Sequence, residues 1–179
     1  IQIPINEETG KRDITKAMNI EGSFIIKNQE NIDGVGTKIN IEKDDSLKAI
    51  VDKINDAAKD QKDETGKVIK GTGTGITATI IDGRIVLTDE KTGARNIYLD
   101  DGENGVLSQL GLAKISAEDY EGKDLKVEIG PDDNKITINK GQQSIFTING
   151  IEVTKDSNAI SDVIEGVTIN LNKAHKSTD

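Results

Sequence analysis

The stretch "DDSLKAIVDKINDAA" (residues 44–58) has the clearest periodic pattern in the chain and decides the fold. Its apolar residues recur at the i, i+3, i+4 and i+7 spacing of one helical face, and they are Leu47, Ile50, Val51 and Ile54. We predict a helix with Asp44 or Asp45 as its N-cap, because a carboxylate accepts hydrogen bonds from the first N–H groups and suits the positive end of the helix dipole. An apolar stripe on one side of a helix needs a sheet to pack against.

The segments on both sides of this helix have the composition that such a sheet requires. They are rich in β-branched residues and cover 22–28, 37–43, 76–93 and 94–101. In 37–43 the apolar Ile39 and Ile41 alternate with polar residues. The segment 76–93 contains Asp82-Gly83 between two β-rich runs, which predicts a hairpin with a type I′ turn.

Three connecting segments are also interpretable. "DITKAM" (13–18) predicts a single helical turn with Asp13 as N-cap. Residues 59–75 are polar and glycine-rich, which indicates a flexible loop. "NGVLSQLGLA" (104–113) predicts one or two helical turns that end at Gly111.

The pattern changes near residue 114, and short alternating strands follow. "DLKVEIGPDDNKITINK" (124–140) predicts two strands around the turn sequence 131–134. In "SIFTINGIEVT" (144–154), Asn149 and Gly150 supply the positive φ angles of a tight hairpin.

The last segment predicts a short helix and a returning strand. Ser157 or Asn158 is the expected N-cap and Gly166 the expected end of the helix. The helical face would consist of Ile160, Val163 and Ile164. The strand 167–171 would then direct inward Val167, Ile169 and Leu171.

The fold class that these elements predict is α+β, with predominantly antiparallel strands. We expect two small β-rich domains, each with one or two short helices. The first covers residues 20–113 and the second 114–179. Residues 1–19 would complete the second domain if one domain is inserted in the other.

Composition excludes several classes of function. The formal charge is −9, from 32 acidic and 23 basic residues, without a basic cluster that would bind the phosphates of nucleic acid. The chain has no cysteine, which excludes zinc–thiolate sites and thiol nucleophiles. No apolar run approaches the roughly 20 residues of a membrane span. Because the chain begins without Met, we expect an internal fragment, and missing targeting signals carry no weight.

Motifs that suggest a ligand have simpler explanations. "GTGTG" (71–75) lacks the spacing of a phosphate loop and precedes a strand, so we expect a loop only. An EF-hand calcium loop that begins with "DDGENG" (100–105) would have Gly102 at its third ligand position and Gly111 where its bidentate Glu belongs, and glycine offers no side-chain ligand. "PDDNK" (131–135) is too short to close a coordination sphere. Solvated turns explain both.

A catalytic site is not evident either. The one histidine, His175, lies in a polar tail, where a bystander is the expected role. An acid-pair hydrolase stays a minor alternative, because 32 acidic residues come close together by chance. We therefore predict no enzyme, no catalytic residue, no metal and no cofactor. The residues singled out are structural: Asp82, Gly83, Asn149, Gly150, Ser157, Asn158 and Gly166.

The segment "FTINGIEVTKDSNAISDVIEGVTINL" (146–171) resembles the flagellar filament cap family, hook-associated protein 2. That family has an apolar "NG" hairpin, then "SN", an "ISD" segment and "GVT". The matching positions are Phe146, Asn149, Gly150, Ser157, Asn158, Ile164, Gly166, Val167, Thr168 and Leu171.

Residues 22–112 show a second resemblance, to the motif shared by flagellins and hook-associated proteins. Its features are the "SLKAIVDKIN" helix, the "GITA" start of a strand, the "LTDEKTG" run and the closing "LGL". In the third of these, Asp89 stands where serine is usual. The C-terminal segment distinguishes the cap family from flagellin.

The resemblance implies a structural role without catalysis. It implies the outer domains of a cap at the distal end of the filament, which promotes flagellin folding and polymerisation and prevents loss of monomers. The implied partners are flagellin, further copies in a ring-like homo-oligomer, and the export machinery with its chaperone through regions outside this chain. It implies an extracellular location at the filament tip, with no nucleic acid and no membrane as partner. The alternative is a surface adhesin or carbohydrate-binding module, for which only Tyr98 and Tyr120 offer stacking rings.

Overall fold

The structure is a computed structural model, and it describes residues 1–30, 33–93, 95–112, 114–115, 126–129, 134–137 and 142–172. The chain forms two compact units, which are residues 1–90 with 96–139 (unit 1) and residues 91–95 with 140–179 (unit 2). Residues 1–19 lie in unit 1, where Ile3 and Met18 join the core. The division into domains at residue 114 stays a prediction.

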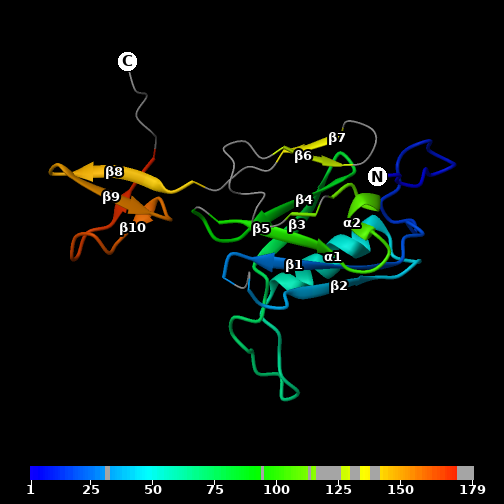
Figure 1. Cartoon of the computed structure of the whole chain (residues 1–179), viewed down its shortest axis with the longest axis horizontal. Helices are drawn as coiled ribbons and strands as arrows, with labels where there is room; N and C mark the ends of the chain where they lie inside the picture. Colours follow the sequence, from blue (N-terminus) through cyan, green and yellow to red (C-terminus); the bar gives the residue numbers. More distant parts are fainter. Residues whose placement is uncertain are drawn as a thin grey trace. The chain divides into compact units, whose positions relative to one another are not determined.

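The described elements are short and mostly strands (Figure 1). Unit 1 contains β1 (Gly22–Asn28), β2 (Thr37–Ile41), α1 (Leu47–Ala58), β3 (Ile76–Ile81), β4 (Arg84–Asp89), β5 (Ile97–Asp101), α2 (Val106–Gln109), β6 (Lys126–Ile129) and β7 (Asn134–Thr137). Unit 2 contains β8 (Ser144–Ile148), β9 (Ile151–Lys155), β10 (Ala159–Ile160) and β11 (Ile169–Asn170). Every pair of these strands is antiparallel, so the predicted α+β class is confirmed.

Unit 1 is built from a three-stranded sheet and a hairpin with α1 between them. The sheet has the order β2-β1-β5, and β3 pairs with β4 as the predicted hairpin. Helix α1 packs against β3 and β2. Strand β1 lies in the centre of its sheet, paired with β2 on one side and β5 on the other, and most of its residues are buried.

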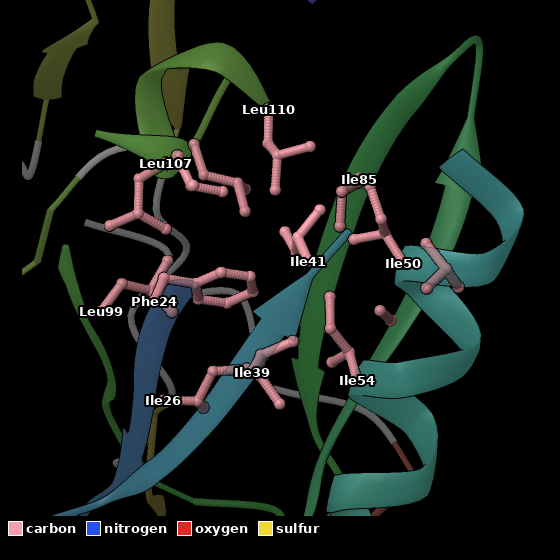
Figure 2. Close-up of a cluster of buried hydrophobic side chains, with 14 of the residues drawn as sticks. Phe24, Ile26, Ile39, Ile41, Ile50, Ile54, Ile85, Leu99, Leu107 and Leu110 are labelled. Carbon is pink, nitrogen blue, oxygen red and sulfur yellow. The ribbon is translucent and has the colours of Figure 1, made fainter. Parts of the chain in front are cut away.

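The core of unit 1 is mostly aliphatic, and its aromatic residues are Phe24 and Tyr98 in the described part of the chain. The predicted helical stripe is confirmed, since Leu47, Ile50 and Ile54 are fully buried. Figure 2 shows Ile50 and Ile54 facing Ile39, Ile41 and Ile85, with the ring of Phe24 nearby. The helix therefore covers the sheet as its periodicity requires.

The N-cap of α1 is Ser46, which corrects the prediction of Asp44 or Asp45. The Ser46 hydroxyl accepts a hydrogen bond from the backbone N–H of Ala49 at 3.1 Å. Asp45 points elsewhere because its carboxylate accepts the N–H of Glu42 at 2.8 Å and pairs with Lys53 at 2.5 Å. Two nearby donors thus compete successfully for the carboxylate.

The predicted helical turn at residues 13–18 is also wrong. Asp13 instead forms a turn in which its Oδ1 accepts the N–H of Thr15 at 3.0 Å and the hydroxyl of Thr15 at 2.6 Å. The Thr15 hydroxyl lowers the pKa of Asp13. A short acidic side chain that satisfies local donors in this way stabilises a turn instead of a helix. At the other end of unit 1, α2 is one turn long and Gly111 follows it with φ 67°.

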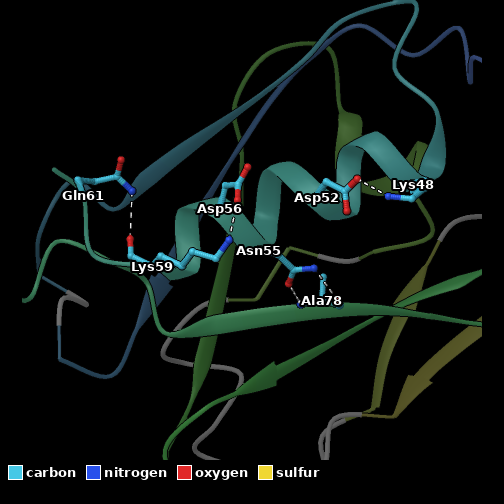
Figure 3. A network of polar contacts seen from close by, with 7 residues as sticks. All are labelled: Lys48, Asp52, Asn55, Asp56, Lys59, Gln61 and Ala78. Carbon is cyan, nitrogen blue, oxygen red and sulfur yellow. Dashed lines mark hydrogen bonds and ion pairs between the residues drawn. The ribbon is translucent and has the colours of Figure 1, made fainter. Parts of the chain in front are cut away.

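A side-chain amide joins α1 to the hairpin. The Asn55 Nδ2 donates to the carbonyl of Ala78 at 3.0 Å, and the Ala78 N–H donates to Asn55 Oδ1 at 2.7 Å. Figure 3 shows this pair below the helix, with the surface contacts Lys48–Asp52 and Lys59–Asp56 on the exposed side. The Asn55 amide therefore satisfies the backbone N–H and C=O of Ala78, as a neighbouring strand would. Ala78 is 4% exposed.

We expect Asn55→Ala to lower the free energy of unfolding by about 1–3 kcal/mol, because it leaves a buried N–H and C=O without partners. Asn55→Asp is the sharper variant, since it keeps the acceptor for Ala78 N–H but sets a carboxylate against the Ala78 carbonyl. Urea unfolding of both variants measures the effect. If both variants unfold at the same denaturant concentration as the parent chain, the amide pair does not hold α1 on β3.

Candidate interaction surface

The two predicted hairpin turns have the positive φ angles that a type I′ turn requires. Asp82 and Gly83 connect β3 to β4 with φ angles of 47° and 72°. Asn149 and Gly150 connect β8 to β9 with φ angles of 50° and 83°. The first turn lies in unit 1 and the second in unit 2.

The surroundings of these turns differ. A Cβ atom on Gly83 would overlap Ile3 Cδ1, and Arg12 donates to the Asp82 carbonyl at 3.3 Å. The first turn therefore anchors the N-terminal segment. A Cβ atom on Gly150 would meet nothing within 4 Å, so this tip is open to solvent.

The open tip gives a test of the turn itself. We expect Gly150→Val to lower the stability of unit 2 by about 1–3 kcal/mol, because it places a β-branched residue at positive φ. Thermal unfolding measures the change. Since space is available around Gly150, unchanged stability would mean that positive φ is not needed there.

Ser157, Asn158 and Gly166 have other roles than the predicted ones, because no helix forms among described residues 157–166. The Ser157 hydroxyl accepts the N–H of Ala159 and bonds to its carbonyl, both at 3.1 Å, which closes a tight turn. Ile160 then pairs with Ile169 as a strand. Residues 157–166 are too few to offset the cost of helix nucleation without a buried helical face, so Ile160 pairs in a strand instead.

Asn158 and Gly166 lie in the turns and contacts around the β10–β11 pair. Asn158 Oδ1 accepts from the hydroxyl of Ser144, and the Asn158 carbonyl accepts the N–H of Leu171 at 2.8 Å. Gly166 has φ 74° in the turn before β11. Val167 is 45% exposed, which corrects its prediction as an inward residue. Asn158 thus links the start of β8 to the end of β11.

Unit 2 has little core of its own in the part that the structure describes. Ile160, at 3% exposure, is the one buried apolar residue found there, whereas Ile145 and Ile151 are 66% and 68% exposed. The register places Ile145 opposite Thr154 on the face that carries Thr147 and Glu152. Ile145 is the one apolar residue among these four, and Ile151 lies on the opposite face, where it pairs with Ile148.

Unit 1 contributes a second surface, formed by the long connection from α1 to β3 (residues 59–75, the arm; Figure 1). At its base, Asp60 Oδ1 accepts the N–H groups of Gly71, Thr72 and Gly73 at 2.9–3.1 Å. The predicted loop at "GTGTG" is therefore held by a carboxylate of the chain itself. Backbone pairing of Lys62 with Val68 continues the arm as a narrow ladder.

The tip of the arm is closed by Asp63. Its Oδ1 accepts the Thr65 hydroxyl at 2.6 Å, the Thr65 N–H at 2.9 Å and the Lys67 N–H at 3.0 Å. The hydroxyl of Thr65 is the main cause that lowers the pKa of Asp63 below 3.8. Sequence reasoning missed both Asp60 and Asp63, although "DETG" is a turn sequence.

A depressed pKa means that the ionised carboxylate orders the tip above pH 3.8, and this order is lost as the pH falls through the lower folded pKa. We therefore expect the amide NMR signals of Thr65 and Lys67 to move toward random-coil values as the pH falls below 3.8. Asp63→Asn keeps the Oδ1 acceptor and does not titrate. If this variant shows the same pH dependence, another group orders the tip.

Other predicted positions lie apart from these surfaces. Asp101 Oδ1 in "DDGENG" accepts the N–H of Leu107 at 3.1 Å. Tyr98 is 6% exposed and its hydroxyl contacts Gln29 Oε1 at 2.9 Å, so its ring is not available for sugar stacking. Residues 131–133, Tyr120 and His175 lie outside the described residues.

Searches for two common site types give negative results within the described part of the chain. There, no group of three His, Cys, Asp or Glu side chains is arranged to hold a metal ion. No described helix has the length and apolar character needed to cross a membrane.

Comparison with known proteins gives one family match in sequence. Residues 141–179 match the family model for the flagellar hook-associated protein 2 C-terminus. No curated protein sequence matches the chain.

Comparison of folds gives similar solved structures. The D2-D3 domains of the flagellar cap protein FliD from Serratia marcescens align with a TM-score of 0.57 and 22% identity, over 93% of this chain and 78% of that chain. The D1-D2-D3 domains of FliD from Escherichia coli align with a TM-score of 0.56 and 20% identity, over 92% of this chain and 40% of that chain. The D2-D3 domains of the Escherichia coli protein align with a TM-score of 0.53 and 21% identity, over 92% and 72% of the two chains.

At these identities the solved structures show a common fold, and the sequence match covers residues 141–179. The two findings come from different properties of the chain and point to the same group of proteins. The chain has the fold of the FliD D2-D3 domains, and its residues 141–179 match the flagellar hook-associated protein 2 family.

Proposed function

We propose that this chain is the outer part of a cap at the distal end of the flagellar filament. In this role it holds flagellin subunits while they fold and polymerise, and it prevents their loss as monomers. The observation that carries the proposal is the family match of residues 141–179 within a chain that has the D2-D3 fold.

The described surfaces support a mechanical and steric role. Unit 2 exposes Ile145 and Ile151 on opposite faces of a two-stranded sheet, and the arm exposes Val68 and Ile69. Exposed strands and apolar side chains bind other proteins by packing and by strand addition. The partners that we propose are flagellin and further copies of the protein in a ring, with export machinery and a chaperone contacting other regions.

The role as a structural protein also fits the residues themselves. Carboxylates in the described part of the chain take part in local backbone contacts, as Asp60, Asp63 and Asp101 do. The adhesin alternative gains no support, because Tyr98 is buried. We therefore propose neither a reaction nor a cofactor, and we propose an extracellular location at the filament tip.

The experiment is complementation of a strain that lacks its cap gene. The full-length protein is supplied with residues 1–179 present or deleted, and filament length and secreted flagellin monomer are measured. We expect filaments with the intact protein, and monomeric flagellin in the medium with the deleted one. Filaments of normal length without residues 1–179 would contradict the proposal.

A further inference from the structure

The outer part of the arm carries three lysines within nine residues of the sequence, Lys62, Lys67 and Lys70. Lys62, Lys67 and Lys70 are exposed, and none forms an ion pair with a described residue. Lysines with a carboxylate partner within 4.0 Å are frequent elsewhere: Lys38, Lys43, Lys48, Lys53, Lys59, Lys114 and Lys155. The arm thus concentrates unpaired positive charge.

These lysines surround apolar side chains. Val68 and Ile69 are 47% and 46% exposed, and they lie between Lys67 and Lys70 in the sequence. The ladder places Lys62 opposite Val68. No acidic residue occurs between residues 65 and 75. An apolar pair with a basic border fits an apolar patch with an acidic border.

The arm is built to keep this arrangement. Two of its three acidic residues, Asp60 and Asp63, bond to the backbone of the arm itself, and Ile69 N–H bonds to the Gln61 carbonyl at 2.8 Å. The carboxylates of Asp60 and Asp63 therefore accept hydrogen bonds from N–H groups at the base and the tip of the arm. A loop ordered in advance loses less conformational entropy when it binds.

We propose that the arm docks on an acidic surface of a second copy of this chain. The chain carries 32 acidic against 23 basic residues, so two copies repel each other except where a basic element meets the acidic remainder. The arm is such an element, with four lysines against three acids. The contact joins different surfaces of the two copies, so it repeats from one subunit to the next. This inference rests on the proposed self-assembly, and it assigns one contact between copies to the arm.

The test uses the absence of cysteine in the chain. Ile69→Cys carries a cysteine-reactive benzophenone on the arm, and an equal amount of isotope-labelled chain distinguishes contacts between copies from contacts within one. Val35→Cys is the matched control, because Val35 is an apolar residue of unit 1 with 88% exposure in another turn. We expect cross-links between copies from position 69, on peptides rich in Asp and Glu, at about five times the yield from position 35 or more.

Charge reversal supplies the second measurement. Lys67→Glu with Lys70→Glu, added to the Ile69→Cys chain, should lower the yield between copies about five-fold, and 0.5 M salt should lower the parent yield as well. Lys11→Glu with Lys16→Glu is the control, which changes net charge equally at another turn. Equal yields from positions 69 and 35, or equal losses with both charge pairs, would overturn the proposal. Complementation does not depend on this result, so failure here leaves the proposed cap function standing.

Discussion

Phe24→Ala is expected to lower the free energy of unfolding of unit 1 by about 3–5 kcal/mol. Phe24 is fully buried in the central strand β1, where it pairs with Ile39 on one side and Asp101 on the other. Its ring fills the space between the sheet and the helices, next to Leu99 and Leu107 in Figure 2. Because a domain of this size is typically stable by about 5–15 kcal/mol, the loss is a large part of the total.

Urea unfolding followed by circular dichroism measures this loss. Phe146→Ala is the matched control, since Phe146 lies in β8 of unit 2 and is only half-buried. We expect the control to cost less than about 2 kcal/mol. A loss with Phe24→Ala that is no larger than the control would contradict the assignment of Phe24 to the centre of the core.

Gly22→Ala is the second change with a large expected effect, about 3 kcal/mol or more. Gly22 has φ 147°, and a Cβ atom there would overlap the carbonyl oxygen of Glu103 and Cγ2 of Val106. The start of β1 and the segment before α2 approach so closely that a methyl group has no space. Backbone on one side cannot move without breaking the β1–β5 pairing.

The control for this change is Gly66→Ala at the tip of the arm. Gly66 has φ 84°, yet its Cβ would meet nothing within 4 Å, so only the cost of positive φ remains, about 1 kcal/mol. Thermal unfolding of both variants separates the steric clash from the backbone strain. Equal losses in the two variants would show that close approach at Gly22 does not limit the fold.

Much of unit 1 follows from patterns that the sequence displays directly. The stripe of α1 predicted its buried face, and the alternation at Ile39 and Ile41 predicted the buried face of β2. Asp82-Gly83 indicated a hairpin, because few residue pairs tolerate two successive positive φ angles. Local periodicity is reliable when the segment is long enough for one face to be buried.

The errors arise where several local partners compete. Ser46 and Asp45 both suit an N-cap, and the Asp45 carboxylate instead binds the Glu42 N–H and Lys53. At Ser157 the apolar spacing suggested a helix, but Ile160 gains a strand partner in Ile169. The contact of Asn55 with Ala78 joins residues that no sequence pattern connects. Such choices depend on residues that the fold brings together.

The candidate surfaces were still less predictable from the sequence. Residues 59–75 have a composition typical of a loop, and the order of the arm depends on Asp60 reaching Gly71, Thr72 and Gly73. Exposure of Ile145 and Val68 likewise depends on packing and not on composition. The family resemblance suggested the proposed role, whereas the structure shows which side chains are exposed.

Immunogold electron microscopy tests the central claim most directly. Antibodies raised against this chain would label filaments of a strain that carries the full-length protein, with a strain that lacks its cap gene as the control. The account predicts gold at the distal end of each filament and none along its length. Label distributed along the filament, or absent from its tip, would contradict a role as the outer part of the cap.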